Sequence, residues 1–205
     1  MILNHKKRED LLSKYKLKRP KTFLVREKSE AIKKANIIGF PVVAKISSDK
    51  HLHRTELDGV VIDIQTEKEL EEAFERLSEI DDINGVIIQK QVEGVEFIVG
   101  AKKDDVFGST IMLGTGGTMV ELFEDVCFRI APIKRREALE MIGEIKGRKL
   151  LNGFRGGPKI DKTELADILV KASKLAFEED VKELDFNPVI GNEEGVYICD
   201  VKIVL

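Results

Sequence analysis

The chain has 205 residues, of which 42% are hydrophobic and 35% are charged, and its formal net charge at pH 7 is −3. This length and hydrophobic content suffice for one domain of ordinary size, or for two small lobes with packed cores. The near balance of basic and acidic residues gives no reason to expect nucleic acid or an anionic membrane as a partner. Abundant charged residues without tryptophan are typical of proteins from hot environments.

Cys127 and Cys199 lie far apart in the sequence, and neither belongs to a Cys-x-x-Cys pair. We therefore expect two reduced, packed thiols rather than a zinc site. Residues 1–7 lack the apolar core of a signal peptide, and no apolar run in the chain reaches membrane-spanning length. These features predict a cytoplasmic protein.

The first elements are predicted from capping residues and short apolar runs. Residues 1–20 are basic and weakly periodic, which predicts a helix that is exposed or packs on another surface. Ser29 is the expected N-cap of a second helix, and Gly39 its expected end. Pro41 then begins a strand over residues 42–46, where β-branched residues are frequent.

A polar stretch leads from that strand into a second strand over residues 59–64. Thr66 and Glu69 then form a capping box, which predicts a helix with one apolar face. A turn at Asn84-Gly85 precedes a buried strand over residues 86–89. Because the two strands around the polar stretch form a hairpin-like pair, we expect a small α+β lobe rather than a purely parallel sheet.

The rest of the chain predicts a second set of strands and helices, with no internal repeat and no low-complexity linker. Strands are expected over residues 95–101, 106–113, 181–185 and 196–203. Between the second and third of these strands we expect two helices, one over residues 135–145 and one opened by a capping box of Asp161 and Glu164. The predicted organisation is an N-terminal helical segment (residues 1–19) followed by two α+β lobes (residues 20–93 and 94–205).

Lys45 is the first candidate functional residue. It follows Pro41-Val42-Val43-Ala44 on a predicted strand, where a buried charge is costly unless it is paired. An inward-pointing lysine at this position is well placed to meet a phosphate group. The alternative is a lysine that points to solvent from a half-buried strand.

The polar stretch after this strand contains His51, His53 and Arg54. Arginine is suited to phosphate recognition, so this stretch is a candidate phosphate-binding loop. A solvated loop without such a role is one alternative. A His-x-His metal site is another, although no third ligand is evident nearby.

Gly114-Thr115-Gly116-Gly117 follows a predicted strand. Glycines allow backbone N–H groups to approach a phosphate closely. The pattern matches neither a Walker loop nor Gly-x-Gly-x-x-Gly, so a plain turn remains an equal alternative.

Acid and amide side chains occur on two predicted neighbouring strands, in Asp185-Phe186-Asn187-Pro188 and Cys199-Asp200-Val201-Lys202. Oxygen ligands of this kind suit magnesium, which usually takes one or two carboxylates and fills its other positions with water and phosphate. An Asn-Pro turn that ends the strand is the alternative.

Considered jointly and in order, these segments resemble the ATP-grasp beta chains of ADP-forming acyl-CoA synthetases. Phe40–Lys45 is similar to the nucleotide-binding lysine strand, and His53–Val60 is similar to the His-Lys-Ser/Thr-Asp/Glu-x-Gly-Gly-Val segment of these beta chains. Gly114–Glu121, Phe128–Pro132 and Glu183–Pro188 are further matches. The resemblance extends from about residue 20 to the end of the chain.

The sequence departs from the family pattern in three places. Asp58 stands where the family has the first glycine of a pair, and Arg54 stands where it has a lysine. Gln89-Lys90-Gln91-Val92 stands where the family often has Gln-Glu-Met-Val, which affects the expected contacts to the adenine edge.

The resemblance implies an ATP-grasp fold of class α+β, with ATP or ADP and Mg²⁺ held between two sheets. It implies the reversible conversion of acyl-CoA, ADP and phosphate into free acid, CoA and ATP. By the resemblance, Lys45, Gly116 and Gly117 contact phosphate, and Arg54 and Arg129 act as phosphate clamps. The adenine is contacted by the main chain of Gln89, Lys90, Gln91 and Val92, and the ribose by Glu96. Asn187 and Asp200 are the implied magnesium ligands, and His53 is the implied phosphoryl relay.

The resemblance also implies a partner, an alpha subunit that carries the CoA-binding and CoA-ligase domains and selects the acyl group. Two other functions remain open. One is a catalytically silent nucleotide-binding module that regulates a partner, although the presence of Lys45, Asn187 and Asp200 argues against it. The other is a self-sufficient carboxylate–amine ligase, for which 205 residues leave little room.

Overall fold

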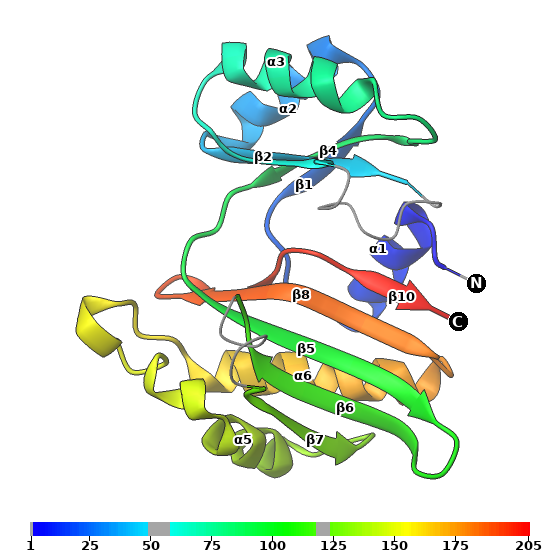
Figure 1. Ribbon diagram of the computed structural model, residues 1–205, viewed down its shortest axis with the longest axis vertical. Coiled ribbons are helices and arrows are strands. Elements are labelled where there is room, and N and C mark those ends of the chain that lie inside the picture. Colours follow the sequence, from blue (N-terminus) through cyan, green and yellow to red (C-terminus); the bar gives the residue numbers. More distant parts are fainter. Residues whose placement is uncertain (1, 49–57, 118–123) are drawn as a thin grey trace. The chain divides into compact units, whose positions relative to one another are not determined.

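The computed structural model of the protein describes residues 2–48, 58–117 and 124–205. Contacts within the chain divide it into two compact units, Met1–Arg19 with Val92–Leu205 (unit 1) and Pro20–Gln91 (unit 2). The N-terminal residues thus belong to the same unit as the C-terminal half of the chain. Each unit has helices against one face of an antiparallel sheet (Figure 1), so the predicted α+β class is confirmed.

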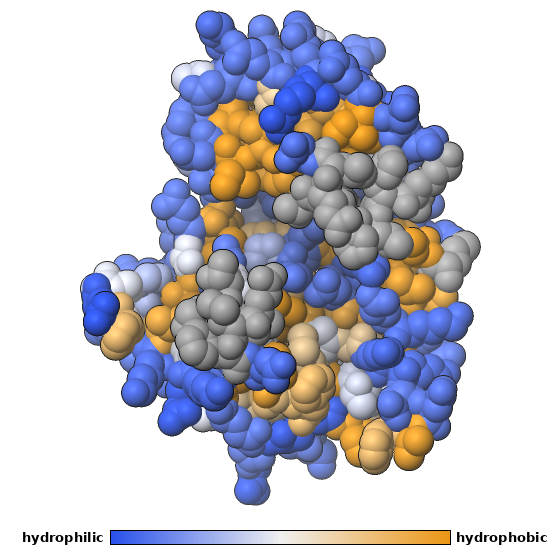
Figure 2. All heavy atoms as spheres, in the orientation of Figure 1, coloured by the Kyte–Doolittle hydropathy of each residue, from blue (hydrophilic) through white to orange (hydrophobic). Residues whose placement is uncertain are grey.

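Unit 2 is built on a four-stranded sheet of order β1-β4-β2-β3, in which every pairing between described residues is antiparallel. Helices α2 and α3 lie on one face of this sheet (Figure 1), and the exposed surface of α3 is hydrophilic (Figure 2). The elements are β1 (Thr22–Val25), α2 (Lys28–Ile38), β2 (Val42–Ser47), β3 (Val60–Ile64), α3 (Glu67–Ser78) and β4 (Gly85–Lys90).

The starts of the two helices in unit 2 differ in how well the sequence predicts them. At α3 the Thr66 side chain accepts a hydrogen bond from the Glu69 N–H at 3.2 Å, so the predicted cap is confirmed. At α2 the prediction is wrong, because the N-cap is Glu27 and Ser29 lies inside the first turn. Nothing caps α2 through a side chain in the described structure, so the position of its start depends on packing against the sheet.

Unit 1 is built on a six-stranded sheet of order β10-β8-β5-β6-β7, with β9 paired to β8. Its elements are α1 (His5–Lys14), β5 (Val95–Asp104), β6 (Gly108–Thr115), β7 (Val126–Ile130), α5 (Arg135–Glu144), the 3₁₀ turns η2 (Lys146–Lys149) and η3 (Phe154–Gly156), α6 (Lys162–Glu178), β8 (Glu183–Asn192), β9 (Gly195–Ile198) and β10 (Lys202–Val204).

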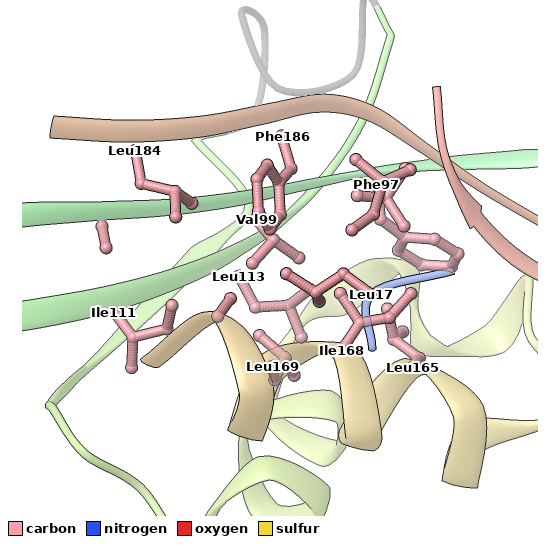
Figure 3. Packing of buried hydrophobic residues seen from close by; sticks show 14 of the residues in the cluster. Leu17, Phe97, Val99, Ile111, Leu113, Leu165, Ile168, Leu169, Leu184 and Phe186 are labelled. Carbon is pink, nitrogen blue, oxygen red and sulfur yellow. The ribbon is translucent and has the colours of Figure 1, made fainter. Parts of the chain in front are cut away.

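The core of unit 1 lies between this sheet and α6. Alternate side chains of the central strands point toward the helix, as Figure 3 shows for Val99 and Phe186 facing Leu169. The predicted start of α6 at Asp161 is confirmed, although its carboxylate accepts from the Thr163 N–H at 2.7 Å and no bond to Glu164 completes a capping box in the described structure. Inward positions alternate with outward ones along the regular parts of each strand, so the core residues assign a face to their neighbours there.

Helix α1 packs on unit 1, which is one of the two alternatives that the sequence left open. The Tyr15 hydroxyl bonds Glu178 at 2.9 Å and Glu179 at 2.8 Å, at the end of α6. Ile2 forms an antiparallel bridge with Val204, so the two ends of the described chain lie side by side. Within the described residues, no helix is long and apolar enough to cross a bilayer.

The strand predictions need correction at four points. Strands β1 and β7 are not predicted from the sequence. Strand β8 continues through Asn187-Pro188 to Asn192, so these residues are not a strand-ending turn. The single strand expected over residues 196–203 is two strands, and Asp200 lies in the break between them.

The cap of α3 predicts a measurable stability difference. Thr66→Ala removes the acceptor for the Glu69 N–H and should lower the free energy of unfolding by about 1 kcal/mol. Ser29→Ala is the matched control, because Ser29 is exposed inside α2 and alanine is the better helix former there. Urea unfolding of both variants tests this, and equal destabilisation would contradict it.

Candidate functional site

Lys45 is buried, with 6% of its surface exposed, so it does not point to solvent. It lies on the face of the unit 2 sheet opposite to Ala44 and Ile46, which pack in the core under α2 and α3. Its Nζ donates to the Gln89 Oε1 at 3.1 Å, and Gln89 in turn donates to the Thr22 Oγ1 at 3.0 Å. The structure therefore brings together two predicted site residues, and a buried amide orients the ammonium group.

Lys90 and Gln91 use their side chains to hold the end of β4. The Lys90 Nζ donates to the carbonyl oxygens of Gly39 and Phe40, both at 3.0 Å. The Gln91 Oε1 accepts from the Asp63 N–H at 2.6 Å. These side chains fix the backbone that leads to Val92, as contacts made through the main chain of this segment would require.

Glu96, Gly116 and Gly117 also lie together, within unit 1. The Gly116 N–H donates to the Glu96 carbonyl oxygen at 2.7 Å. A Cβ at position 116 would lie 2.7 Å from the Glu96 Cβ, so only glycine fits this close approach of two backbones. Gly117 has a φ of +70°, where a side chain would be strained.

Asn187 lies in β8, and Asp200 lies in the break between β9 and β10, the two strands that pair with one side of β8. Strands β9 and β10 pair with β8 in one register, with Ile198 opposite Val189 and Lys202 opposite Asp185. Counting inward from both pairs sets Asp200 opposite Asn187, and opposed residues share a face of the sheet.

A β-bulge marks this position. Val189 pairs with Phe97 of β5, whereas Phe186 pairs with Val99, so Asn187 and Pro188 together oppose the single residue Ile98. Bulges re-aim side chains next to functional sites. The Asn187 side chain is exposed on the face opposite to Phe186, which lies in the core.

Asp185 joins this pair, since it lies two residues before Asn187 on the same face of β8. Burial raises the pKa of the Asp185 carboxyl above its ordinary value, and the negative charge of Asp200 raises this pKa further, while Lys202 lowers it. A cation bound beside the two carboxylates would relieve their repulsion, so the residues present fit a divalent metal. Among the described residues, no group of three or more His, Cys, Asp or Glu side chains is placed to hold a metal ion.

Arg129 lies apart from these groups. It pairs with Ile111 across β6 and β7, and Ile111 is a core residue, so Arg129 projects toward the helical side of the sheet. There its guanidinium forms an ion pair with Glu144 of α5. The structure thus places Arg129 on the face opposite to Asn187, and its role as a phosphate clamp stays a prediction.

The candidate relay residue His53 and the candidate phosphate ligand Arg54 lie outside the described residues, as does the competing His51. The described structure resumes at Asp58, which has a left-handed φ of +50°. Glycine adopts this conformation without strain and aspartate tolerates it, which accounts for the exchange of one for the other at this position.

Sequence reasoning missed one buried acid, Asp125, which is 6% exposed. It lies between Glu124 and Val126 and carries no motif, so only its contacts with distant backbone reveal it. A cavity of about 250 Å³ lies beside it, lined by Thr115, Asp125, Lys146, Gly147, Lys149, Leu150 and Phe154.

Comparison with known proteins gives a match over the whole chain. A family model described as an ATP-grasp domain matches residues 1–205. The chain is 40% identical over 206 residues to acetate–CoA ligase [ADP-forming] II of Archaeoglobus fulgidus, covering 100% of this chain and 30% of that protein. It is 38% identical to acetate–CoA ligase [ADP-forming] I subunit beta of Pyrococcus furiosus, covering 96% of this chain and 89% of that subunit.

Solved structures also match this chain over almost its whole length. Dinucleotide forming acetyl-coenzyme A synthetase 1 of Ca. Korarchaeum cryptofilum, in complex with coenzyme A, Ca-AMPCP and HgCl⁺, superposes with a TM-score of 0.91 and 35% identity over 100% of this chain and 93% of that one. A second structure of that protein contains coenzyme A and Mg-AMPPCP, with a phosphohistidine segment pointing towards the nucleotide binding site. It superposes with a TM-score of 0.84 and 37% identity over 99% of this chain and 92% of that one.

The ion pair of Arg129 leads to a test of its role. If the role of Arg129 is to form the ion pair with Glu144, then Arg129→Gln and Glu144→Gln should each lower the free energy of unfolding by about 0.2–1 kcal/mol, because the pair is partly exposed. Both variants should keep the Kd for Mg-ADP, measured by calorimetry, within about twofold of the wild type. A tenfold rise for Arg129→Gln alone would instead establish the phosphate clamp.

Proposed function

We propose, from the premise that this chain belongs to the ATP-grasp family, that it is the nucleotide-binding beta part of an ADP-forming acyl-CoA synthetase. In this function it transfers a phosphoryl group between a phosphohistidine and ADP. The proposal is supported by the common register of β9 and β10 on β8, from which Asp200 is counted opposite Asn187, with Asp185 on the same sheet face. These oxygen ligands suit the Mg²⁺ that accompanies a nucleotide.

The chemistry fits what these residues can do. Catalysis of phosphoryl transfer consists mainly of positioning and charge neutralisation. Lys45, held by Gln89 in a buried position, presents a positive charge to the nucleotide phosphates. Asn187 and Asp200 would hold magnesium, which would supply neutralisation of phosphate charge. The segment from Gln89 to Val92 offers main-chain groups to the adenine, and Glu96 with Gly116 and Gly117 lines the ribose and phosphates.

The acyl-CoA chemistry belongs, in this proposal, to a partner. The chain spans 30% of the length of the A. fulgidus ligase but 89% of the P. furiosus beta subunit. The same module thus occurs in relatives both as part of a longer chain and as a separate subunit. We propose that this chain works in the cytoplasm with an alpha subunit that carries the CoA-binding and CoA-ligase domains.

Nucleotide binding should depend on Lys45. Lys45→Met keeps most of the buried volume but removes a charge-assisted phosphate contact worth about 1.5–3 kcal/mol, so the Kd for Mg-ADP should rise about ten- to a hundredfold. Lys33→Ala, an exposed lysine on α2, is the control and should bind as the wild type does. Calorimetry decides, and an unchanged Kd for Lys45→Met would remove Lys45 from the site.

Binding should depend on magnesium through Asp200. Asp200→Asn is nearly isosteric, so the fold should persist while the magnesium concentration needed for half-maximal ADP binding rises about tenfold. Asp180→Asn makes the same change at an exposed residue with a φ of +49°, which asparagine tolerates, and should have no effect. Coincident magnesium titrations of Asp200→Asn and the wild type would refute the assignment.

His53 should carry the phosphoryl group. A neutral imidazole can attack the phosphoryl donor, and protonation then makes it a good leaving group. His53→Asn should keep Mg-ADP binding and lose phosphorylation, whereas His51→Asn should keep both. The assay supplies labelled phosphate, acyl-CoA and the partner chain, and measures acid-labile label on this chain. Label on His53→Asn would disprove the relay role.

A further inference from the structure

We infer that Asp125 is a positioning residue for nucleotide binding, because its buried carboxylate fixes the backbone that leads into Gly116 and Gly117. The inference rests on the proposed function, in which those two glycines contact the phosphates. Asp125 itself does not belong to any of the segments that resemble the family's functional motifs.

Both carboxylate oxygens of Asp125 accept hydrogen bonds. Oδ2 accepts from the Thr115 Oγ1 at 2.6 Å and from the Gly147 N–H at 2.7 Å, and Oδ1 accepts from the Lys146 N–H at 2.6 Å. The Asp125 carbonyl oxygen also accepts from the Thr115 N–H at 3.1 Å. One residue thus ties the end of β6 and the start of β7 to the 3₁₀ turn η2.

The carboxylate is held as an anion. Burial raises the pKa of Asp125, but the hydrogen bonds from Thr115, Lys146 and Gly147 outweigh this effect and bring the pKa below its ordinary value. A buried carboxylate bound by several donors has little freedom to move, because loss of any donor removes part of the compensation for its charge. The position of Thr115 is therefore set by its bond to a fixed group.

Gly147 makes this arrangement possible. A Cβ at position 147 would lie 2.1 Å from the Thr115 Oγ1 and 2.9 Å from its Cγ2. The absence of a side chain lets the Gly147 N–H and the Thr115 hydroxyl reach the same carboxylate oxygen. An alanine at 147 must displace the hydroxyl from Asp125.

The effect reaches the predicted phosphate contacts through one peptide bond. Thr115 is the last residue of β6, and Gly116 follows it directly, with its N–H on the Glu96 carbonyl oxygen. The backbone here is held by β5 on one side and by Asp125 on the other. Binding groups need to be held within about 0.5 Å of the productive geometry, so a shift of Thr115 should weaken phosphate binding.

The first test compares Mg-ADP affinity with stability in the full chain. Asp125→Asn places an amide NH₂ against one of the two backbone N–H donors, so the Kd should rise about tenfold. Thr115→Val, which lacks the hydroxyl, should raise the Kd severalfold, and Thr115→Ser, which keeps it, should stay within about twofold of the wild type. Calorimetry is done at a temperature where circular dichroism shows each variant folded.

A matched control separates positioning from general destabilisation. Ser173 is fully buried in the same unit, accepts from the Ile133 N–H at 3.1 Å and donates to the Val170 carbonyl oxygen at 2.8 Å. Ser173→Ala should lower Tm and leave the Kd for Mg-ADP unchanged. Asp125→Asn should instead change the Kd by more than its loss of Tm accounts for.

A double-mutant cycle tests the steric link. Gly147→Ala should raise the Kd in the wild-type background. In the Thr115→Ala background it should add less than about twofold, because the two nearest atoms, the Thr115 Oγ1 and Cγ2, are gone and only the Cβ at 3.1 Å remains.

The outcomes distinguish failure of the proposed function from failure of the inference about Asp125. If the wild-type chain does not bind Mg-ADP, the proposed function fails and this inference fails with it. If the wild type binds and Asp125→Asn and Thr115→Val stay within twofold of its Kd, the inference alone is overturned. If Asp125→Asn does not fold, Thr115→Val against Thr115→Ser decides in the same way.

Discussion

The pairing of β8 with β5 on one side and with β9 and β10 on the other is the constraint on which unit 1 depends. Strand alternation along β8 sends Leu184 and Phe186 into the core and leaves Asp185 and Asn187 on the opposite face. The same hydrogen-bond ladder therefore sets the packing and the spacing of the oxygen ligands. A one-residue slip would exchange the two sets of side chains, so the hydrophobic effect enforces the geometry of the proposed metal site.

Unit 2 is constrained differently, because it buries a positive charge inside a small fold. The ammonium group of Lys45 is out of bulk solvent, where an unpaired charge is costly, and the carbonyl oxygen of Gln89 compensates part of that cost. Gln89 is itself fixed by Thr22 on β1. The edge strand β1 thus supports the site indirectly, and the ordering of Lys45 before any ligand arrives reduces the entropy lost on binding.

The sequence predicts those features that local chemistry determines. The cap at Thr66 and the helix start at Asp161 follow from side chains that bond to their own first turn. Strand β1, the inner position of Ser29 and the break at Asp200 depend on pairing between distant segments, for which local residues give no signal. The sequence left open whether Lys45 is buried, and its role as a phosphate contact stays a prediction from the resemblance. Asp125 was missed because two of its donors, Lys146 and Gly147, lie far along the chain in η2. Family resemblance supplied the candidate site residues, whereas their faces on the sheets required the structure.

The bridge between Ile2 and Val204 gives the module freedom in how it can be connected. Entry and exit of the polypeptide are neighbours on one sheet edge, so a longer protein can accommodate the whole segment without stretching a linker across it. The fold needs no change to serve as one part of a fused ligase or as a separate chain, and relatives of both kinds exist. The two arrangements differ in the effective concentration at which such a module meets its partner domains, which a covalent linker raises.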